Sequence, residues 1–264
     1  MVEGEVLHVA LYPPDTVDTE QVKKVAEVVH KEPYDTRLLM VGEMPRLIAH
    51  CHDMPMAESL ARSLGELGLV AFICRDSELR RHSQRFMART MEFAEGEVVF
   101  RDRGGQVERV GSGDAFLIVK GKTETQTEAE STDMKMKVNW RATLLTGGIP
   151  IMRSVREKTG EESIETELFA RVYNRKSSER CIEVIQHQVD YSFLGADMAL
   201  STLANFNTFV SKLQETFPQA AFNDRLMKPF KADIPSSGGQ ESIEINCNML
   251  YLYHMAVSGA GPPG

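Results

Sequence analysis

The chain has 264 residues, of which 42% are hydrophobic and 26% charged, so it is too apolar to be disordered and long enough for two domains. No apolar run approaches the ~18 residues that a membrane-spanning helix needs. The N-terminus is acidic, whereas a signal peptide begins with basic residues. The net charge of −8 disfavours a general affinity for nucleic acid or anionic membranes. We therefore expect a cytoplasmic protein with no transmembrane segment.

Four cysteines are present, namely Cys51, Cys74, Cys181 and Cys247. They are widely spaced and include no Cys-x-x-Cys pair, whereas a secreted protein of this size usually has a denser and more regular set. Reduced thiols are therefore expected, in agreement with a cytoplasmic location.

Residues 1–76 predict an α+β domain with the order strand, helix, helix, strand, helix, strand. Asp18 and Gln21 form a capping-box pattern at the start of the first helix, and Asp53 can cap the third helix. Gly68 ends the third helix, and a buried strand follows at residues 69–74. The apolar residues that repeat at helical spacing are Val22, Val25, Ala26 and Val29, and then Met56, Leu60, Ala61, Leu64 and Leu67.

This element order, with its Ala-x-x-Leu-Ala-x-x-Leu-x-x-Leu-Gly helix, resembles the small domain shared by the ribosomal stalk protein's C-terminal half and the adaptor of the Clp protease. The resemblance implies a module that binds other proteins. The protease adaptor has an Asn-Asp-Asp turn after the first strand, which helps hold a substrate's N-terminal amine. This chain has Tyr12-Pro13-Pro14-Asp15 there, so only Asp15 can be carried over.

The partner-binding surface is expected near the loop 12–15 and the short helix of residues 34–40. Two tyrosines would be rigid apolar anchors with a polar tip, two acids would receive a basic or amino-terminal group, and an arginine would be a forked donor. The candidate residues are Tyr12, Asp15, Tyr34, Asp35 and Arg37.

His50, Cys51, His52 and Asp53 form the one concentration of metal-capable side chains in the sequence. In an extended segment the two histidines face the same side, so the tetrapeptide supplies two or three ligands and needs a distant fourth, from His30 or His8. The alternative interpretation is a strand end with Cys51 in the core and Asp53 as a helix cap. No second ligand pair stands at a recognisable spacing, which favours the alternative.

Residues 77–91 contain four arginines and are predicted to form a basic helical connector. From residue 92 onward the apolar pattern changes to a two-residue period, which predicts a mostly antiparallel β domain over residues 92–230. A hairpin is expected around residues 103–105, and a projecting acidic hairpin or mobile loop at residues 123–132. The clearest half-buried strand covers residues 134–144, and a phase shift between Val184 and Ile185 suggests a bulge.

One long amphipathic helix follows these strands. Antiparallel strands followed by such a helix resemble the pleckstrin-homology-like architecture over residues 92–217. The expected remainder, residues 231–264, is a loop, a short element and a disordered tail rich in Gly and Pro. The apolar stripe of the helix consists of Ala199, Leu203, Phe206, Val210, Leu213 and Phe217.

The sequence contains no Gly-x-Ser-x-Gly elbow, His-Glu-x-x-His helix, phosphate loop or dinucleotide fingerprint. We therefore expect a non-catalytic protein-binding or adaptor protein that needs no cofactor and whose partner is another protein or a peptide. The alternative is a metal-dependent hydrolase that uses the cluster from His50 to Asp53.

Overall fold

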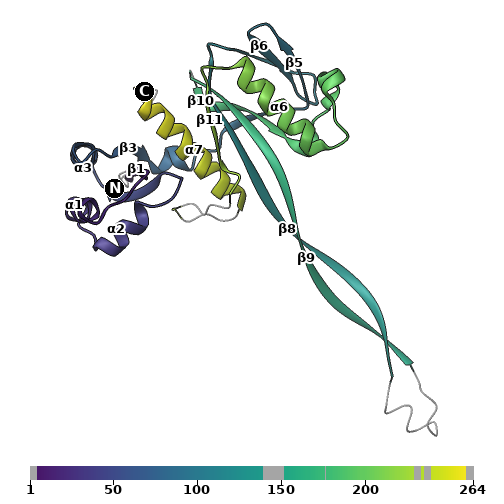
Figure 1. The fold of residues 1–264 in the computed structure, drawn as a ribbon. Coiled ribbons are helices and arrows are strands. Elements are labelled where there is room, and N and C mark those ends of the chain that lie inside the picture. The colour runs from purple at the N-terminus through teal and green to yellow at the C-terminus, as the bar shows by residue number, and fades with distance from the viewer. Residues whose placement is uncertain (1–4, 139–151, 176, 229–232, 235–238, 260–264) are drawn as a thin grey trace. The chain divides into compact units, whose positions relative to one another are not determined.

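Figure 1 shows the computed structural model, which describes residues 5–138, 152–175, 177–228, 233–234 and 239–259. The predicted α+β class is confirmed, because helices accompany three separate β-sheets. The chain forms two compact units. The larger unit contains Met1–Thr123 and Glu167–Gly264, and the smaller contains Glu124–Thr166. The larger unit therefore includes residues 1–76 together with most of the β-rich region, which the sequence assigned to different domains.

The N-terminal region has the predicted element order. Its antiparallel sheet has the strand order β2-β1-β3. The elements are β1 (Leu7–Tyr12), α1 (Thr19–Val29), α2 (Pro33–Leu39), β2 (Arg46–Cys51), α3 (Met54–Glu66) and β3 (Val70–Arg75).

Local signals in the sequence fix the ends of these helices. The carboxylates of Asp18 and Asp53 accept hydrogen bonds of 2.8 Å from the backbone N–H groups of Gln21 and Met56, so both predicted caps are present. Gly68 follows α3 with a φ of +78°, a left-handed conformation that glycine adopts without strain. The helix and strand boundaries around α3 therefore follow from residues that are close in sequence.

Two layers cover the N-terminal sheet. Val9 and Leu11 of β1 face a core shared with α1 and α3, in which Val25 and Leu64 are buried. Ala10 of β1 packs in a second core on the other face of the sheet. The central strand is consequently buried on both sides, in line with its mostly apolar sequence.

The β-rich region contains a five-stranded sheet in the order β11-β8-β9-β10-β4 and a three-stranded sheet in the order β5-β6-β7. Two pairings in the larger sheet, β4 with β10 and β11 with β8, are parallel. The strands are β4 (Gln84–Ala88), β5 (Thr90–Ala94), β6 (Glu97–Arg101), β7 (Val107–Gly111), β8 (Ala115–Val138), β9 (Met152–Asn174), β10 (Ser177–Ile185) and β11 (Ala221–Leu226). The helical elements are α4 (Asp76–Leu79), the 3-10 segments η1 (Gln186–Gln188) and η2 (Tyr191–Asp197), α6 (Thr202–Thr216) and α7 (Gly239–Val257).

The predicted helical connector at residues 77–91 is wrong in its secondary structure. The helix α4 has only four residues, and the chain then enters the edge strand β4. Phe86 and Ala88 alternate with Arg85 and Met87, and this two-residue period suits a strand whose Phe86 pairs with Ile182 of β10. The four arginines of this segment suggested a basic helix, although the alternation of residues in β4 is typical of a strand.

The predicted helix after the strands is present as α6, which begins at Thr202 with Ser201 as its cap. It packs with the three-stranded sheet in one apolar core against the five-stranded sheet. The predicted stripe is correct at Phe206, Val210, Leu213 and Phe217, all of which are buried. Leu203 is 49% exposed and does not belong to the core.

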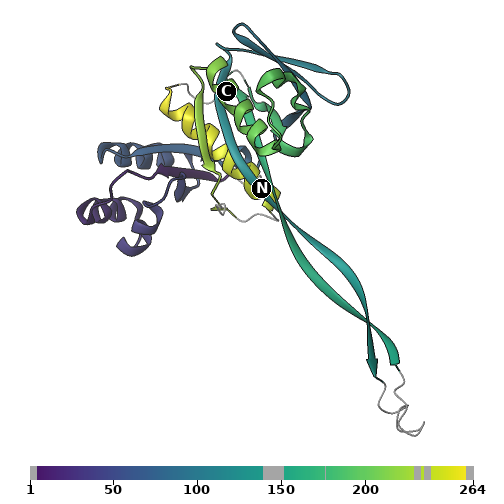
Figure 2. The same ribbon diagram turned by 45° about the vertical axis from the view of Figure 1, so that its right-hand side comes forward.

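The short element predicted within residues 231–264, a final strand or short helix at residues 242–255, is the helix α7, which is longer than expected at 19 residues. Most of the predicted loop before it lies outside the described residues. Ile245 and Met249 of α7 pack against the N-terminal sheet, while Cys247 and Leu250 pack against the five-stranded sheet. Figures 1 and 2 show α7 between these two sheets. A helix that is apolar on opposite sides lacks the single stripe that reveals an amphipathic helix.

A buried ion network joins α7 to the five-stranded sheet. The guanidinium of Arg171, which is 0% exposed, donates to both carboxylate oxygens of Glu244 on α7 at 2.6 and 3.0 Å. It also donates to Glu183 of β10 at 2.7 Å. Arg85 of β4 contacts Glu183 at 3.1 Å and Glu244 at 3.4 Å, so two arginines balance two glutamates. Paired charges of this kind compensate the cost of burial.

The smaller unit is a two-stranded ribbon formed by residues 124–138 of β8 and 152–166 of β9 (Figure 1). The sequence predicted two strands in residues 116–144 with a hairpin or loop between them at 123–132, but β8 runs through this segment without a break. Alternating threonines at positions 123, 125 and 127 have the β-branched form that suits a strand. Residues 139–144 of the predicted strand lie outside the described residues.

The predicted bulge between Val184 and Ile185 is wrong, because the register shift in the pairing of β10 with β9 lies between Ser177 and Cys181. The apolar pattern changes near Ile185 for another reason, since the strand ends there and η1 begins at Gln186.

Candidate functional site

The five predicted partner-binding residues do not have equivalent environments. Tyr34, Asp35 and Arg37 lie on α2 and are exposed, and Asp15 is exposed in the loop after β1. Tyr12 stacks on Tyr253 of α7 with the ring centroids 4.3 Å apart and an interplanar angle of 14°. The guanidinium of Arg225 lies 5.3 Å from the centroid of the Tyr12 ring. Tyr12 thus has an intramolecular packing role, which sets it apart from the three residues of α2.

One side of α2 is fixed to the core. Pro33 stands in the first turn, where the missing N–H costs nothing, and Glu32 is the N-cap residue. Thr36 is buried, and its hydroxyl donates to the carbonyl of Glu32 at 3.0 Å. Met40 is fully buried just after the helix. These contacts fix which side of the helix faces outward.

The outward side carries an apolar strip, defined here as Tyr34, Leu38 and Val41. These side chains are 73%, 48% and 43% exposed, respectively. Tyr34 and Leu38 are four residues apart and are therefore neighbours on one helix face, and Val41 follows just beyond the helix end. Tyr34 was predicted from the sequence as a partner-binding residue, but Leu38 and Val41 were not, although their i, i+4, i+7 spacing from Tyr34 indicates one helix face.

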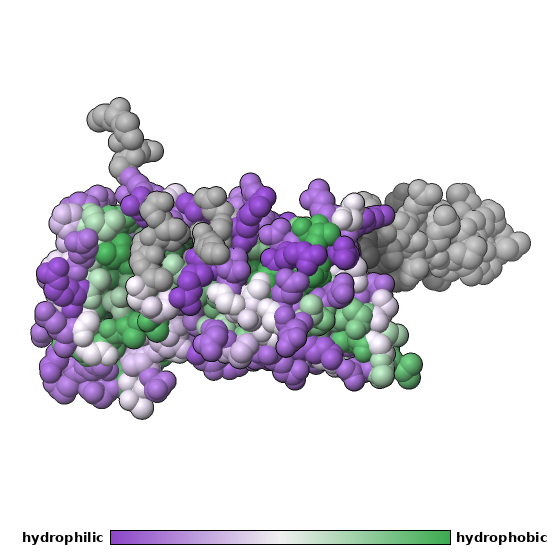
Figure 3. Space-filling view, turned by 90° about the horizontal axis from the view of Figure 1, so that it is seen from above, coloured by the Kyte–Doolittle hydropathy of each residue, from purple (hydrophilic) through white to green (hydrophobic). Residues whose placement is uncertain are grey.

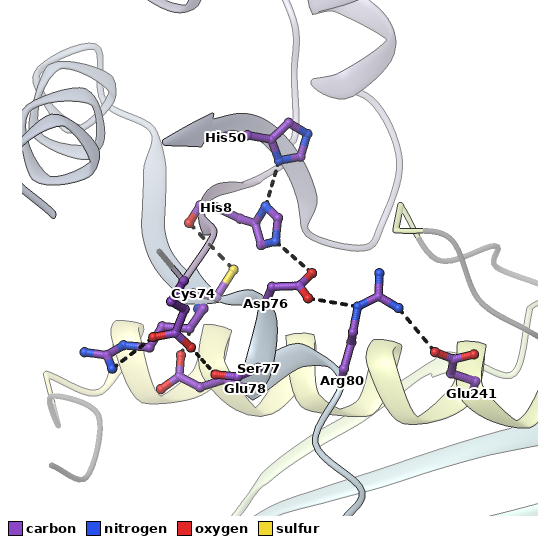
Figure 4. Close-up of polar contacts among 10 residues, drawn as sticks. His8, His50, Cys74, Asp76, Ser77, Glu78, Arg80 and Glu241 are labelled. Atoms are coloured by element: carbon purple, nitrogen blue, oxygen red, sulfur yellow. Dashed lines mark hydrogen bonds and ion pairs between the residues drawn. The ribbon is translucent and has the colours of Figure 1, made fainter. Parts of the chain in front are cut away.

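The cluster from His50 to Asp53 takes part in a chain of polar contacts (Figure 4). His8 of β1 pairs with His50 across the antiparallel strands, and their Nδ1 atoms are 2.7 Å apart. The Nε2 atom of His8 lies 3.2 Å from a carboxylate oxygen of Asp76. Asp76 accepts a hydrogen bond of 2.9 Å from Arg80, which lies 3.3 Å from Glu241 of α7. The contacts therefore connect the edge of the N-terminal sheet with α7.

The carboxylate sets the donor role of one nitrogen in this chain. Asp76 can only accept when ionised, so His8 donates to it through Nε2, and the second contact joins the Nδ1 atoms of His8 and His50. Partial burial lowers the pKa of His50, and the neighbouring His8 and Lys31 lower it further, while Asp76 opposes this shift. The polar contacts therefore favour the neutral form of His50.

The potential nucleophiles beside this chain are engaged elsewhere. The thiol of Cys74 contacts the backbone carbonyl of His8 at 3.7 Å, and burial raises the pKa of this thiol far above its usual range. The hydroxyl of Ser77 donates to the carboxylate of Glu5. Neither group is available for activation by His8, so the histidine pair forms a structural connection.

The sequence motif does not converge on a metal site. Cys51 is buried in the core, and Asp53 caps α3 through Met56, as the alternative interpretation expected. His50 is bonded to His8, and His52 is exposed. Across the part of the chain that the structure describes, no three His, Cys, Asp or Glu side chains are arranged to hold a metal ion.

His254 of α7 gives the fold a dependence on pH. Its Nε2 atom lies 3.3 Å from the amide nitrogen of Asn223. Burial, and to a lesser extent the charge of Arg225, lowers the pKa of His254 from 6.5 to about 4. As the pH falls from 6.5 towards 4, His254 becomes protonated in the unfolded chain but stays neutral in the folded chain, so acid favours unfolding. We therefore expect the free energy of unfolding to decrease by about 2–3 kcal/mol over this interval.

Urea unfolding of the His254→Gln variant at pH 7.5 and 4.5 measures this contribution, since glutamine keeps a hydrogen-bonding group but does not titrate. The variant should lose less stability on acidification than the unmodified protein. A His52→Gln variant, altered at an exposed position, should behave like the unmodified protein. Equal acid sensitivity of all three proteins would show that His254 protonates as freely in the folded state as in the unfolded chain.

Comparisons with known proteins give no relative for this chain. No family model matches it, and neither a curated protein nor a solved structure is significantly similar to it. None of the described helices is long and apolar enough to cross a membrane.

Proposed function

We propose that this is a cytoplasmic protein-binding or adaptor protein that recognises another protein through the exposed side of α2. The apolar strip of Tyr34, Leu38 and Val41 is the observation that supports this proposal. Exposed apolar residues are common singly, whereas here two are neighbours on one face of an anchored helix and a third follows just past its end, so that a partner could cover all three. Tyrosine is also enriched among residues that dominate binding energies.

The charges beside the strip define the chemistry of the partner. Asp35 and Arg37 directly precede and follow the buried Thr36 in the sequence of α2, and both are exposed. A partner with an apolar patch bordered by a base and an acid would pair with them. Such rim charges mainly select and orient a partner, while the apolar centre supplies most of the affinity. In Figure 3 apolar patches interrupt a largely hydrophilic surface, which suits a protein that stays dispersed until it meets a partner.

The state of the cysteines supports the cytoplasmic part of the proposal. All four are free and buried, and burial raises the pKa of each thiol. A reducing compartment maintains such thiols. The metal-dependent hydrolase has less support, because Cys51 and Asp53 of its supposed site are occupied by core packing and helix capping.

The proposal predicts that a Tyr34→Ala, Leu38→Ala double variant loses its partner. Affinity purification from the native host, followed by a titration with the partner that it identifies, should show weakening by more than 1 kcal/mol, the usual mark of a contributing residue. The melting temperature should hardly change, because both side chains are exposed.

The matched control is Met198→Ala with Leu203→Ala, two apolar residues that are also about half-exposed. This variant should bind like the unmodified protein. If it loses the partner while the α2 variant keeps it, recognition belongs to the surface around Met198 and the first turn of α6. Sedimentation analysis covers the remaining alternative, since a dimer that dissociates in the α2 variant would identify a second copy of this chain as the occupant.

A further inference from the structure

Two short edge strands of the larger unit border one pocket. The strand β4 ends the five-stranded sheet, and β7 ends the three-stranded sheet. A pocket of about 340 Å³ is lined by residues of both strands and by parts of β9 and β10, within the range of about 300–1,000 Å³ that is typical of ligand sites. Within the described residues, β4 pairs only with β10 and β7 only with β6, so each strand has one edge without a neighbouring strand.

The lining combines an apolar wall with polar groups. Phe86 of β4, Val107 of β7 and Ile182 of β10 contribute apolar side chains, and Val107 is 42% exposed. Gln84 of β4 and Gln106, which directly precedes β7, also line the pocket, and both carry side-chain amides. Side-chain amides both donate and accept hydrogen bonds, and so do unpaired strand edges. Both therefore suit the alternating N–H and C=O groups of an extended polypeptide.

The charges around the pocket are not equivalent. The guanidinium of Arg85 is paired with Glu183 and Glu244, so its charge is already compensated. Arg180, by contrast, is exposed and forms no ion pair with any residue whose side chain the structure describes. It is therefore the cation that can receive an acidic group from a ligand. Glu108 of β7 also lines the pocket, and its negative charge opposes a second acidic group.

From these features we infer that the pocket binds an extended peptide segment of another protein by strand addition. One acidic side chain of the peptide contacts Arg180, and an apolar neighbour contacts the wall formed by Val107 and Phe86. Its backbone pairs with the outer edge of β4 or β7, because an unpaired edge offers the donors and acceptors that a further strand needs. This site is separate from α2, so the inference stands whether or not the α2 surface binds a protein. With both surfaces active, the chain could connect two partners.

Panning a phage-displayed library of random decapeptides on the immobilised full-length chain tests the inference without knowledge of the natural ligand. The enriched peptides should combine an acidic residue with apolar residues. Fluorescence anisotropy of the best peptide should show at least tenfold weaker binding to Arg180→Glu and to Val107→Lys. Arg103→Glu makes the same charge change as Arg180→Glu outside the pocket and should alter the affinity less than twofold.

Hydrogen exchange distinguishes strand addition from a purely electrostatic contact, since only backbone pairing should protect amides of β4 or β7 when the peptide binds. Protection there, together with loss of binding in both pocket variants, would support the inference. No enrichment, binding that both variants retain, or protection confined to other elements would each overturn it. Circular dichroism of each variant at the assay temperature confirms that it is folded, and Val107→Lys provides a second test if Arg180→Glu is not.

Discussion

Replacing Arg171 by Met should lower the free energy of unfolding by about 3–5 kcal/mol, the usual cost of removing one partner from a buried ion pair. Arg171 is fully buried and donates to Glu183 and to both oxygens of Glu244. Its removal leaves two buried carboxylates with Arg85 as their remaining cation. Urea denaturation at pH 7 measures the loss.

A second variant shows whether uncompensated charge causes this loss. In the Arg171→Met background, Glu183→Gln with Glu244→Gln removes both negative charges and should restore part of the stability. A loss below about 0.5 kcal/mol for Arg171→Met alone, as is usual for surface substitutions, would contradict the buried network and the placement of α7 against the sheet.

The second large effect should come from Phe206→Ala, with a decrease in the free energy of unfolding of about 3–5 kcal/mol. Phe206 is fully buried in α6, and its ring centroid lies 5.9 Å from that of Phe209. Truncation removes apolar contacts and leaves a cavity that the rigid surroundings fill only partly.

Leu203→Ala is the matched control for this prediction, because Leu203 lies on the same helix but is 49% exposed. It should change the stability by no more than about 0.5 kcal/mol. Equal losses for the two variants would contradict the orientation of α6, which presents Phe206 and not Leu203 to the core.

The elements that the sequence predicted correctly depend on short-range signals. In the segment of α3 and β3, Asp53 supplies the cap, Leu64 belongs to a stripe at helical spacing, and Gly68 ends the helix. Each signal acts within a few residues, so no knowledge of the tertiary fold is needed to interpret it.

One element was predicted only as a short strand or helix, and another was predicted wrongly, because their neighbours in space come from distant parts of the chain. The helix α7 is apolar towards two different sheets, as Ile245 and Cys247 illustrate, so it shows no amphipathic stripe. In β4, the charge of Arg85 suggested a solvent-exposed helix. In the structure Arg85 is instead paired with Glu183 and Glu244, which are distant in sequence. Tertiary contacts determine both elements, and local propensity does not.

The candidate site was predicted in part. The sequence indicated that α2 carries Tyr34, Asp35 and Arg37, and all three are exposed. It could not show that Tyr12 stacks on Tyr253, because that contact depends on α7. The pairing of His8 with His50 was equally hidden, since it depends on the strand register of β1 with β2.

The most direct test of the protein-binding proposal is photo-crosslinking in native cells, with p-benzoylphenylalanine placed at position 34, at 38, or at the exposed control position Glu27 on α1. The proposal predicts that one and the same protein is captured from positions 34 and 38 but not from 27. Capture from position 34 should also disappear when Leu38→Glu is introduced, because a charge in the apolar strip opposes burial. Equal capture from all three positions, or capture from position 34 that persists in the Leu38→Glu variant, would contradict recognition through α2.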